Sequence, residues 1–436
     1  MLKFKVASFL NQWKPFFLHN LWAGLSTLVK ALMQLFLLKI VILQFGESGL
    51  GIVGQAMSCL IIFQNLLSGG ILSFTITSVS KASKESPKDR IYGTTALWSI
   101  ACVIISLIVA VLFSSKISQA VFLDSQYSWY FIALAFLSVC FSAFMLSNGI
   151  ISSYRNVKAL FFSNLITLVL GVISFYLLLK SYNLIGALIG ILIVYSLQSL
   201  VYFIVAYSMR YISLADLRPV YDKPMLKQLV GFSVLFAITG VLSNLYQVFI
   251  RSFVIGTVGL SWAEVGRWQS VTKISDVIIN FISVTIMTAY LPALSKAHSI
   301  ENADEVLKNF SKKIIPLIIL SCGTVAIFAP ILLRIIYSAE LISTAPLLRW
   351  QMLGDVFKFS TCVFSYFFMA RAKIVVLMVY EIIGVCILTV VTIALVNTYQ
   401  LNGLVYANLI SGLLAMVTGS LIYWGLKTKF TRFIKA

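Results

Sequence analysis

The chain has 436 residues, of which 60% are apolar and only 11% are charged. An ordinary soluble domain carries ~25% charged residues, and one membrane-spanning helix needs ~20 predominantly apolar ones. The composition therefore excludes a disordered chain, a disulfide scaffold and an ordinary soluble enzyme, and it predicts an all-α polytopic membrane protein. The net charge of +19 is typical of a membrane protein that keeps Lys and Arg in its cytoplasmic loops, so we expect no nucleic-acid partner.

Residue types that carry catalytic or metal chemistry are sparse. The six cysteines lie within apolar runs without a CxxC or CxxH spacing, and the two histidines stand apart from other ligand types. The sequence also lacks a phosphate-binding loop, an HExxH zinc motif and a GxSxG nucleophile motif. We therefore predict no metal, no cofactor and no enzymatic activity.

Apolar runs that end at charged or turn residues predict twelve transmembrane helices. In chain order they span residues 21–43, 50–80, 91–113, 129–152, 159–179, 184–208, 228–256, 262–292, 314–336, 345–369, 374–396 and 401–425. Each is long enough to cross the hydrocarbon core of a bilayer. Pro330 lies inside the segment 314–336, so a kink is expected there.

The basic residues between these segments indicate the orientation of the chain. The side that holds both termini carries 23 Lys and Arg, whereas the opposite side carries 2, Lys116 and Lys180. Because positive loops remain on the cytoplasmic side, both termini are expected in the cytoplasm.

The two halves of the sequence resemble each other. Ser80-Lys81-Ala82 recurs as Ser295-Lys296-Ala297, and Tyr182–Gly186 recurs as Tyr399–Gly403, at offsets of 215 and 217. Six helices per half is an even number, so the repeats are parallel and related by an axis along the membrane normal. The predicted organisation is an N-lobe (1–210), an interlobe linker (211–227) and a C-lobe (228–436) around a central cavity, as in an alternating-access transporter.

Ionisable residues inside the predicted helices mark the candidate site. Such side chains are costly in hydrocarbon and normally face the bundle interior or a cavity. Basic residues outnumber acidic ones within these helices, so the expected cavity is basic and suits a phosphate or diphosphate. The predicted substrate-binding residues are Lys30, Arg251, Lys273 and Lys358.

Asp276, Asp355 and Glu381 are the acidic candidates. They would couple transport to H⁺ or Na⁺, or hold the lysines in place. A structural alternative is that Lys273 with Asp276, and Asp355 with Lys358, neutralise each other as i, i+3 pairs.

Several stretches also resemble a known transporter family. Residues 25–30 are followed by a glycine turn at 46–51, and then by 265–276, 290–295 and 349–358. In this order they resemble the Wzx-type flippases for O-antigen and enterobacterial common antigen units, in the multidrug/oligosaccharidyl-lipid/polysaccharide exporter superfamily. The residues that match the motifs are Lys30, Lys273, Asp276, Asp355 and Lys358, whereas Arg251 is assigned from the polar stripe of its own helix.

The resemblance implies two six-helix lobes around a V-shaped cavity. It implies transfer of an undecaprenyl-diphosphate-linked oligosaccharide from the cytoplasmic to the periplasmic leaflet of a bacterial inner membrane. The implied partners are membrane lipids, the polysaccharide polymerase and the chain-length regulator. The turn at 46–51 reads Gly-Glu-Ser where the family often has proline, which leaves the sugar specificity open.

Three other functions remain in competition. A cation-coupled multidrug antiporter of the same superfamily would need a deep acidic residue in the N-lobe, where the segment 21–43 offers lysines instead. A lipid II flippase of the fourteen-helix group would need two more helices. A membrane scaffold or glycosyl-lipid enzyme would predict neither the repeat nor the basic stripes.

Overall fold

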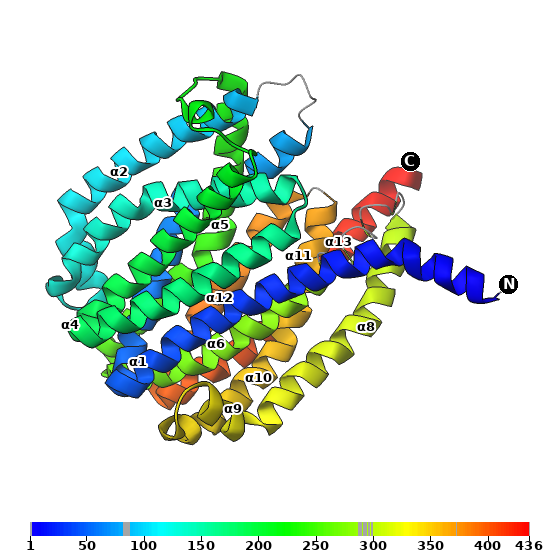
Figure 1. Cartoon of the computed structure of the whole chain (residues 1–436). Coiled ribbons are helices and arrows are strands. Elements are labelled where there is room, and N and C mark those ends of the chain that lie inside the picture. The colour runs from blue at the N-terminus through cyan, green and yellow to red at the C-terminus, as the bar shows by residue number, and fades with distance from the viewer. Residues whose placement is uncertain are drawn as a thin grey trace. The chain divides into compact units, whose positions relative to one another are not determined.

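The protein is all-α and multi-pass, as the sequence predicts. The computed structural model describes residues 2–81, 88–286, 300–371 and 373–435, with the single positions 290, 294 and 297. Within these ranges the regular structure is helical and no strand occurs (Figure 1). Eight of these helices are long and apolar enough to cross a membrane.

The helices follow the predicted segments closely. Their bounds are α1 (Leu2–Lys81), α2 (Lys88–Phe122), α3 (Ser128–Ser153), α4 (Val157–Ser208), α5 (Lys223–Phe253), α6 (Trp262–Thr285), α8 (Ile300–Ile327), α9 (Ala329–Ile336), α10 (Ala345–Ser360), α11 (Cys362–Ala370), α12 (Ile374–Tyr399) and α13 (Leu401–Lys435). A π-helical turn, Val254–Val258, extends α5.

Two predicted helices are joined in α1, two more are joined in α4, and other segments are divided. The backbone turns inside α1 at Gly46, with φ 62°, and inside α4 at Asn183, with φ 54°. The segment 314–336 divides into α8 and α9, and Pro330 lies in the first turn of α9, where proline is tolerated. The helix is interrupted at Phe328, two residues before Pro330, so the expected kink is confirmed as the break between α8 and α9. The count of twelve transmembrane helices stays a prediction.

The described chain forms two compact units. Unit 1 comprises residues 1–37 and 59–241, and unit 2 comprises residues 38–58 and 242–436. Both α1 and α5 therefore contribute residues to each unit. The predicted division into an N-lobe, a linker and a C-lobe is not tested by these units and stays a prediction.

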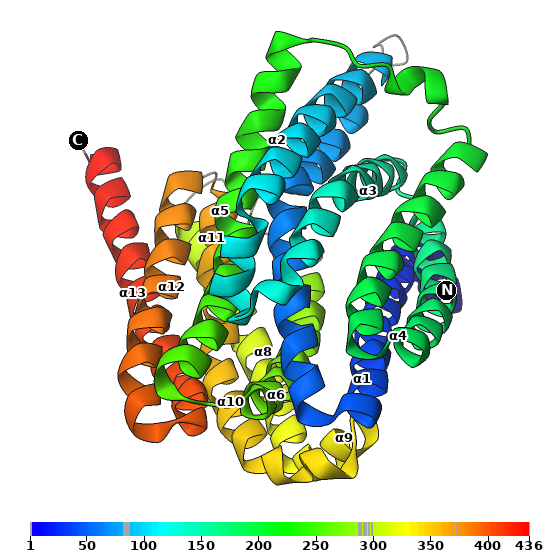
Figure 2. The same cartoon turned by 90° about the vertical axis from the view of Figure 1, so that its left-hand side faces the viewer.

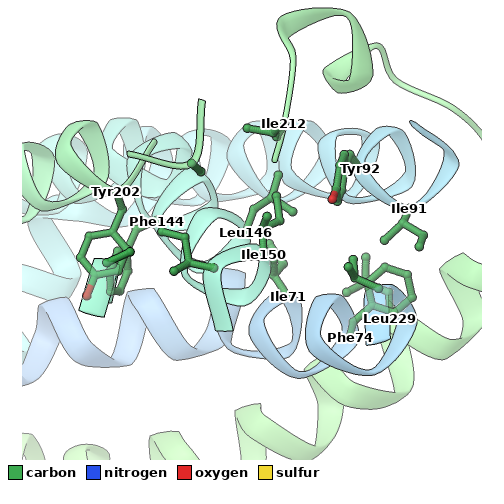
Figure 3. Close-up of a cluster of buried hydrophobic side chains, with 14 residues drawn as sticks. Ile71, Phe74, Ile91, Tyr92, Phe144, Leu146, Ile150, Tyr202, Ile212 and Leu229 are labelled. Carbon is green, nitrogen blue, oxygen red and sulfur yellow. The ribbon is translucent and has the colours of Figure 1, made fainter. Parts of the chain in front are cut away.

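Unit 1 is held together by packing of α2 against α3 and of α3 against α4. A cluster of buried apolar side chains, including Phe74, Tyr92, Phe144 and Tyr202, joins these helices to the end of α1 (Figure 3). The Tyr202 hydroxyl donates to Asn164 Oδ1 at 2.7 Å, so even this ring brings its polar atom to a buried partner.

Unit 2 is arranged around α10. This helix packs against α6, α8 and α13, and α12 runs beside α13 (Figure 2). Because α10 has neighbours on several sides, its polar side chains Gln351 and Asp355 are buried in the protein, and they belong to the candidate site.

The internal repeat is visible in the backbone of each unit. Asn183 and Gln400 both have a positive φ, of 54° and 49°, at the offset of 217. Each turn is followed by a glycine packed on backbone, because a Cβ on Gly186 would lie 2.0 Å from Leu178 O and one on Gly403 would lie 2.7 Å from Leu395 O. These two leucines are again 217 residues apart. The repeat predicted from sequence is therefore confirmed at this helix–helix turn.

We expect Gly186→Ala to lower the free energy of unfolding by about 1–3 kcal/mol, the usual cost of overpacking. The new Cβ would meet a backbone carbonyl that cannot move without breaking the turn. The unfolding midpoint of the purified protein in detergent measures the effect. Gly231→Ala is the matched control, since a Cβ on Gly231 in α5 has no neighbour within 4 Å. Equal midpoints for the two variants would contradict this account of the turn.

Candidate functional site

A cavity of about 210 Å³ lies inside unit 2. Side chains from α5, α6, α10, α11, α12 and α13 line it, and they follow helical spacing. The α12 face consists of Tyr380, Glu381, Gly384, Val385 and Leu388, and the α13 face includes Asn408, Ser411 and Gly412. Because these positions are three or four residues apart, each helix turns one continuous face toward the same space.

Asp355 lies directly behind the lining of this cavity, against three lining residues. Its side chain is fully buried and accepts hydrogen bonds from the hydroxyl of Ser275 and the amides of Gln351 and Asn408, the latter two at 3.0 and 2.9 Å. All three donors are neutral and line the cavity. Among the described residues no hydrogen-bonded ion pair joins Asp355 to Lys358, and the neutralisation of these two residues by each other stays a prediction. The carboxylate is held by neutral dipoles.

Lys273 and Asp276 form the ion pair that their spacing predicts. Lys273 Nζ lies 2.8 Å from Asp276 Oδ2, and the lysine is 8% exposed. Asp276 faces the cavity, whereas Lys273 supports it from behind. The positive charge of Lys273 is therefore largely neutralised within α6.

Lys358 and Glu381 also face the cavity. Lys358 is exposed and, among the described residues, its ammonium takes part in no ion pair or hydrogen bond. Glu381 Oε1 accepts a hydrogen bond from Ser365 Oγ at 2.9 Å. Lys358 thus provides a cation that remains available to a ligand.

Arg251 is the largest fully buried side chain of the described residues. Its Nη1 donates to Gly54 O, Gln55 Oε1 and Ser58 Oγ at 3.2, 3.3 and 2.8 Å. Its Nη2 donates to the side-chain oxygens of Gln247 and Gln269, and the guanidinium lies 5.5 Å from the Trp268 ring. These partners connect residues 54–58 of α1 with α5 and α6. The predicted role of Arg251 in substrate binding is not tested, and in this structure its hydrogen bonds are made within the protein.

Lys30 belongs to unit 1, apart from the other predicted residues. It is half-buried on α1, one turn after Ser26, whose hydroxyl accepts a hydrogen bond from Asn164 Nδ2 at 2.7 Å. Its nearest polar network is therefore neutral, and its role in substrate binding stays a prediction.

The cavity of unit 2 is not basic by itself. Asp276 and Glu381 line it together with one lysine, Lys358. Asp355 and Lys273 lie directly behind this lining, so the carboxylates of the site outnumber its lysines by three to two. The basic cavity predicted from the sequence includes basic residues from the whole chain, and it stays a proposal. Within the described ranges, no group of three His, Cys, Asp or Glu side chains is placed to hold a metal ion.

Several lining residues were not predicted from the sequence. Tyr246, Trp268 and Tyr380 give the cavity aromatic walls, and Asn408 supplies an amide from α13. The sequence does indicate a buried role for Asn408, because an amide in the middle of an apolar helix is costly without a hydrogen-bond partner. It gives no such indication for the aromatic residues, because most aromatic side chains of membrane proteins pack or face lipid headgroups.

Comparison of the sequence with known proteins identifies relatives of this chain. The family model for polysaccharide biosynthesis proteins matches residues 19–298, more than half of the chain. The Lipid III flippase of Escherichia coli (strain K12) is 26% identical over 360 residues, which cover 81% of this chain and 85% of the relative. The Lipid III flippase of Shigella flexneri matches to the same extent.

Solved structures share the fold. An inward-facing multidrug resistance MATE family transporter of the MOP superfamily superposes with a TM-score of 0.73 at 14% identity, covering 92% of this chain and 96% of the other. The lipid II flippase MurJ in an inward closed conformation gives a TM-score of 0.69 at 15% identity, covering 95% and 87%. At these identities the likeness shows the fold alone.

We expect Arg251→Met to lower the free energy of unfolding by about 1–3 kcal/mol for each acceptor that loses its only donor. The substitution keeps much of the side-chain volume but removes the guanidinium from the oxygens of Ser58, Gln247 and Gln269. Thermal unfolding of the purified protein measures the loss. Arg334→Met is the matched control, because Arg334 is exposed on α9 and its change should stay within about 0.5 kcal/mol. An Arg251→Met protein that unfolds at the wild-type temperature would show that these hydrogen bonds do not stabilise the fold.

Proposed function

The chain belongs to the polysaccharide biosynthesis protein family, and on that premise we propose that it is a flippase for a lipid-linked oligosaccharide. The substrate is an undecaprenyl-diphosphate-linked unit of the O-antigen type, moved from the cytoplasmic to the periplasmic leaflet by alternating access. The observation that carries the proposal is the similarity to the Lipid III flippase over 81% of the chain. The multi-pass helical fold supports it, since the protein has the spans that such a transporter needs.

The proposed substrate-binding residues are Lys30, Arg251, Lys273 and Lys358. Lys30 and Lys358 attract the diphosphate, because neither lysine forms an ion pair in the described part of the protein. Lys273 and Arg251 complete the basic surface from behind the cavity wall. Asp276, Asp355 and Glu381 couple the cycle to H⁺ or Na⁺, and Asp355 is the best placed because its partners are neutral.

The proposal includes a location and partners. The protein resides in the inner membrane of a bacterium with both termini in the cytoplasm, consistent with the bias of basic residues toward that side. It acts without catalysing a chemical reaction on its substrate. The polysaccharide polymerase and chain-length regulator of the same pathway are its proposed protein partners.

A cation-coupled multidrug antiporter is the second candidate function. Asp276 and Glu381 both face the cavity of unit 2 and would attract a cationic drug. The fold is shared with MATE transporters, so the two functions differ in the ligand and not in the architecture.

Lys358→Gln should slow flipping by about 10–100-fold, because a charge-assisted hydrogen bond contributes about 1.5–3 kcal/mol. The assay uses proteoliposomes with a labelled polyprenyl-diphosphate oligosaccharide and follows its accessibility to an impermeant glycosidase. Lys116→Gln, an exposed lysine of α2, is the control and should flip at the wild-type rate. If wild-type protein flips the oligosaccharide no faster than empty liposomes do but transports a cationic dye, the flippase proposal is wrong and the antiporter function is supported.

Asp355→Asn should abolish stimulation of flipping by a pH or Na⁺ gradient while slow exchange without a gradient remains. The amide has nearly the same shape as the carboxylate but carries no charge and does not titrate. Flipping is measured with and without each gradient in the same proteoliposomes. Ser411→Ala, another change at the cavity, should keep the stimulation. Full stimulation in Asp355→Asn would remove Asp355 from the coupling mechanism.

A further inference from the structure

The lining of the unit 2 cavity is rich in neutral hydrogen-bonding groups. Three amide side chains, Gln247, Gln351 and Asn408, face it together with six Ser and Thr hydroxyls. A ligand that exchanges several hydroxyl hydrogen bonds with water would find replacements here. Five of the six hydroxyls already donate a hydrogen bond within the protein, and each of their oxygens can still accept one from a ligand hydroxyl.

Apolar and aromatic side chains also line the cavity. Tyr246, Trp268 and Tyr380 border the cavity, and Val385 and Leu388 continue this surface along α12. A pyranose ring combines a rim of hydroxyls with apolar C–H faces, so it matches a site with a few fixed polar groups between aromatic walls.

The charge of the cavity lining differs between the two ends of α10. Lys358 is exposed, whereas Gln351, two turns earlier on the same helix, is 3% exposed. Seven residues of helix separate them by about 10 Å. The available cation thus lies at the exposed end, and the buried end offers amides, hydroxyls and the Asp355 carboxylate. A diphosphate is favoured near Lys358, because the deeper charges already have partners within the protein: Lys273 is paired with Asp276, and Asp355 accepts hydrogen bonds from neutral side chains.

The buried end also contains an acceptor without a donor. The Nε2 of Gln351 donates to Asp355 at 3.0 Å, but its Oε1 has no hydrogen-bond partner among the described residues. Native proteins rarely leave such an atom unsatisfied.

From these features we propose that the unit 2 cavity is a saccharide subsite that takes one neutral sugar residue of the transported glycan. This inference rests on the proposed flippase function and specifies which part of the substrate unit 2 binds. The volume of about 210 Å³ is smaller than the ~300–1,000 Å³ of sites for drug-sized ligands, which suits one ring rather than a whole oligosaccharide. The sugar next to the diphosphate occupies the amide-lined end, while its phosphate remains near Lys358.

Gly384 allows a direct test of occupancy. It lies on the cavity face of α12, and a Cβ added there meets no atom within 4 Å. Gly384→Leu therefore fills the cavity without displacing backbone. Gly323→Leu is the matched control, since Gly323 is also a half-buried helical glycine of unit 2 with open space at its Cβ, but it lies on α8 outside the cavity lining.

The experiment uses full-length protein in nanodiscs and saturation-transfer NMR. The probes are the methyl glycosides of glucose, galactose and N-acetylglucosamine at millimolar concentration, with inorganic pyrophosphate and a cationic dye for comparison. We expect at least one glycoside to bind wild type and Gly323→Leu equally, and to bind Gly384→Leu about tenfold more weakly. Flipping of the lipid-linked oligosaccharide should fall in parallel. If Gly384→Leu unfolds, Thr272→Val removes a cavity hydroxyl at nearly constant volume and should also weaken glycoside binding.

The outcomes separate the subsite from the flippase function. Wild type that flips the oligosaccharide but binds none of the glycosides, or equal glycoside binding by both leucine variants, would overturn the subsite and leave the flippase intact. Wild type that neither flips nor binds a glycoside would overturn both. If only dye binding to wild type is observed, and Glu381→Gln abolishes it, the cavity is a cation site instead.

Discussion

A guanidinium buried in so apolar a chain must find all of its acceptors within the protein, and unit 2 depends on how Arg251 does so. Water is not available at this depth, and an unsatisfied charged donor would be far more costly than any single packing defect. The acceptors come from residues 54–58, from Gln247 on α5 and from Gln269 on α6. Arg251 thereby links its own helix, α5, to α6 and to residues 54–58, which lie 193–197 positions earlier in the sequence. It also contacts Gln247 and Trp268 of the cavity lining.

The same rule explains why the cavity is polar without being strongly charged. Lys273 is paired with Asp276, and Asp355 is surrounded by neutral donors, so the buried charges are satisfied before any ligand arrives. What remains available is one exposed lysine, Glu381 and a set of amides and hydroxyls. Such a surface suits a substrate that is itself divided into an anionic part and a hydroxyl-rich part.

The duplicated halves share backbone geometry but not chemistry. The turns at Asn183 and Gln400 have the same unusual φ, and each is followed by a glycine packed on the preceding helix. At the same offset of 217, however, Asn164 in unit 1 corresponds to Glu381 in unit 2. Asn164 belongs to a neutral network with Ser26 and Tyr202, whereas Glu381 faces a cavity. The two halves thus share the geometry of this turn, while the polar residue at this position differs between them.

The sequence by itself determined the class of fold, the helical segments, the repeat and the Lys273–Asp276 pair. Each of these depends on local patterns: apolar length, turn residues and i, i+3 spacing. Only the tertiary structure decided that Asp355 is held by Ser275 and Asn408, which are 80 and 53 residues away. It alone placed Arg251 in a cage of neutral acceptors and joined the aromatic walls into a cavity. The sequence of a helix indicates which face of the helix a residue occupies. The hydrogen-bond partner of a buried polar group depends instead on which helices pack together, and no local pattern in the sequence encodes those contacts.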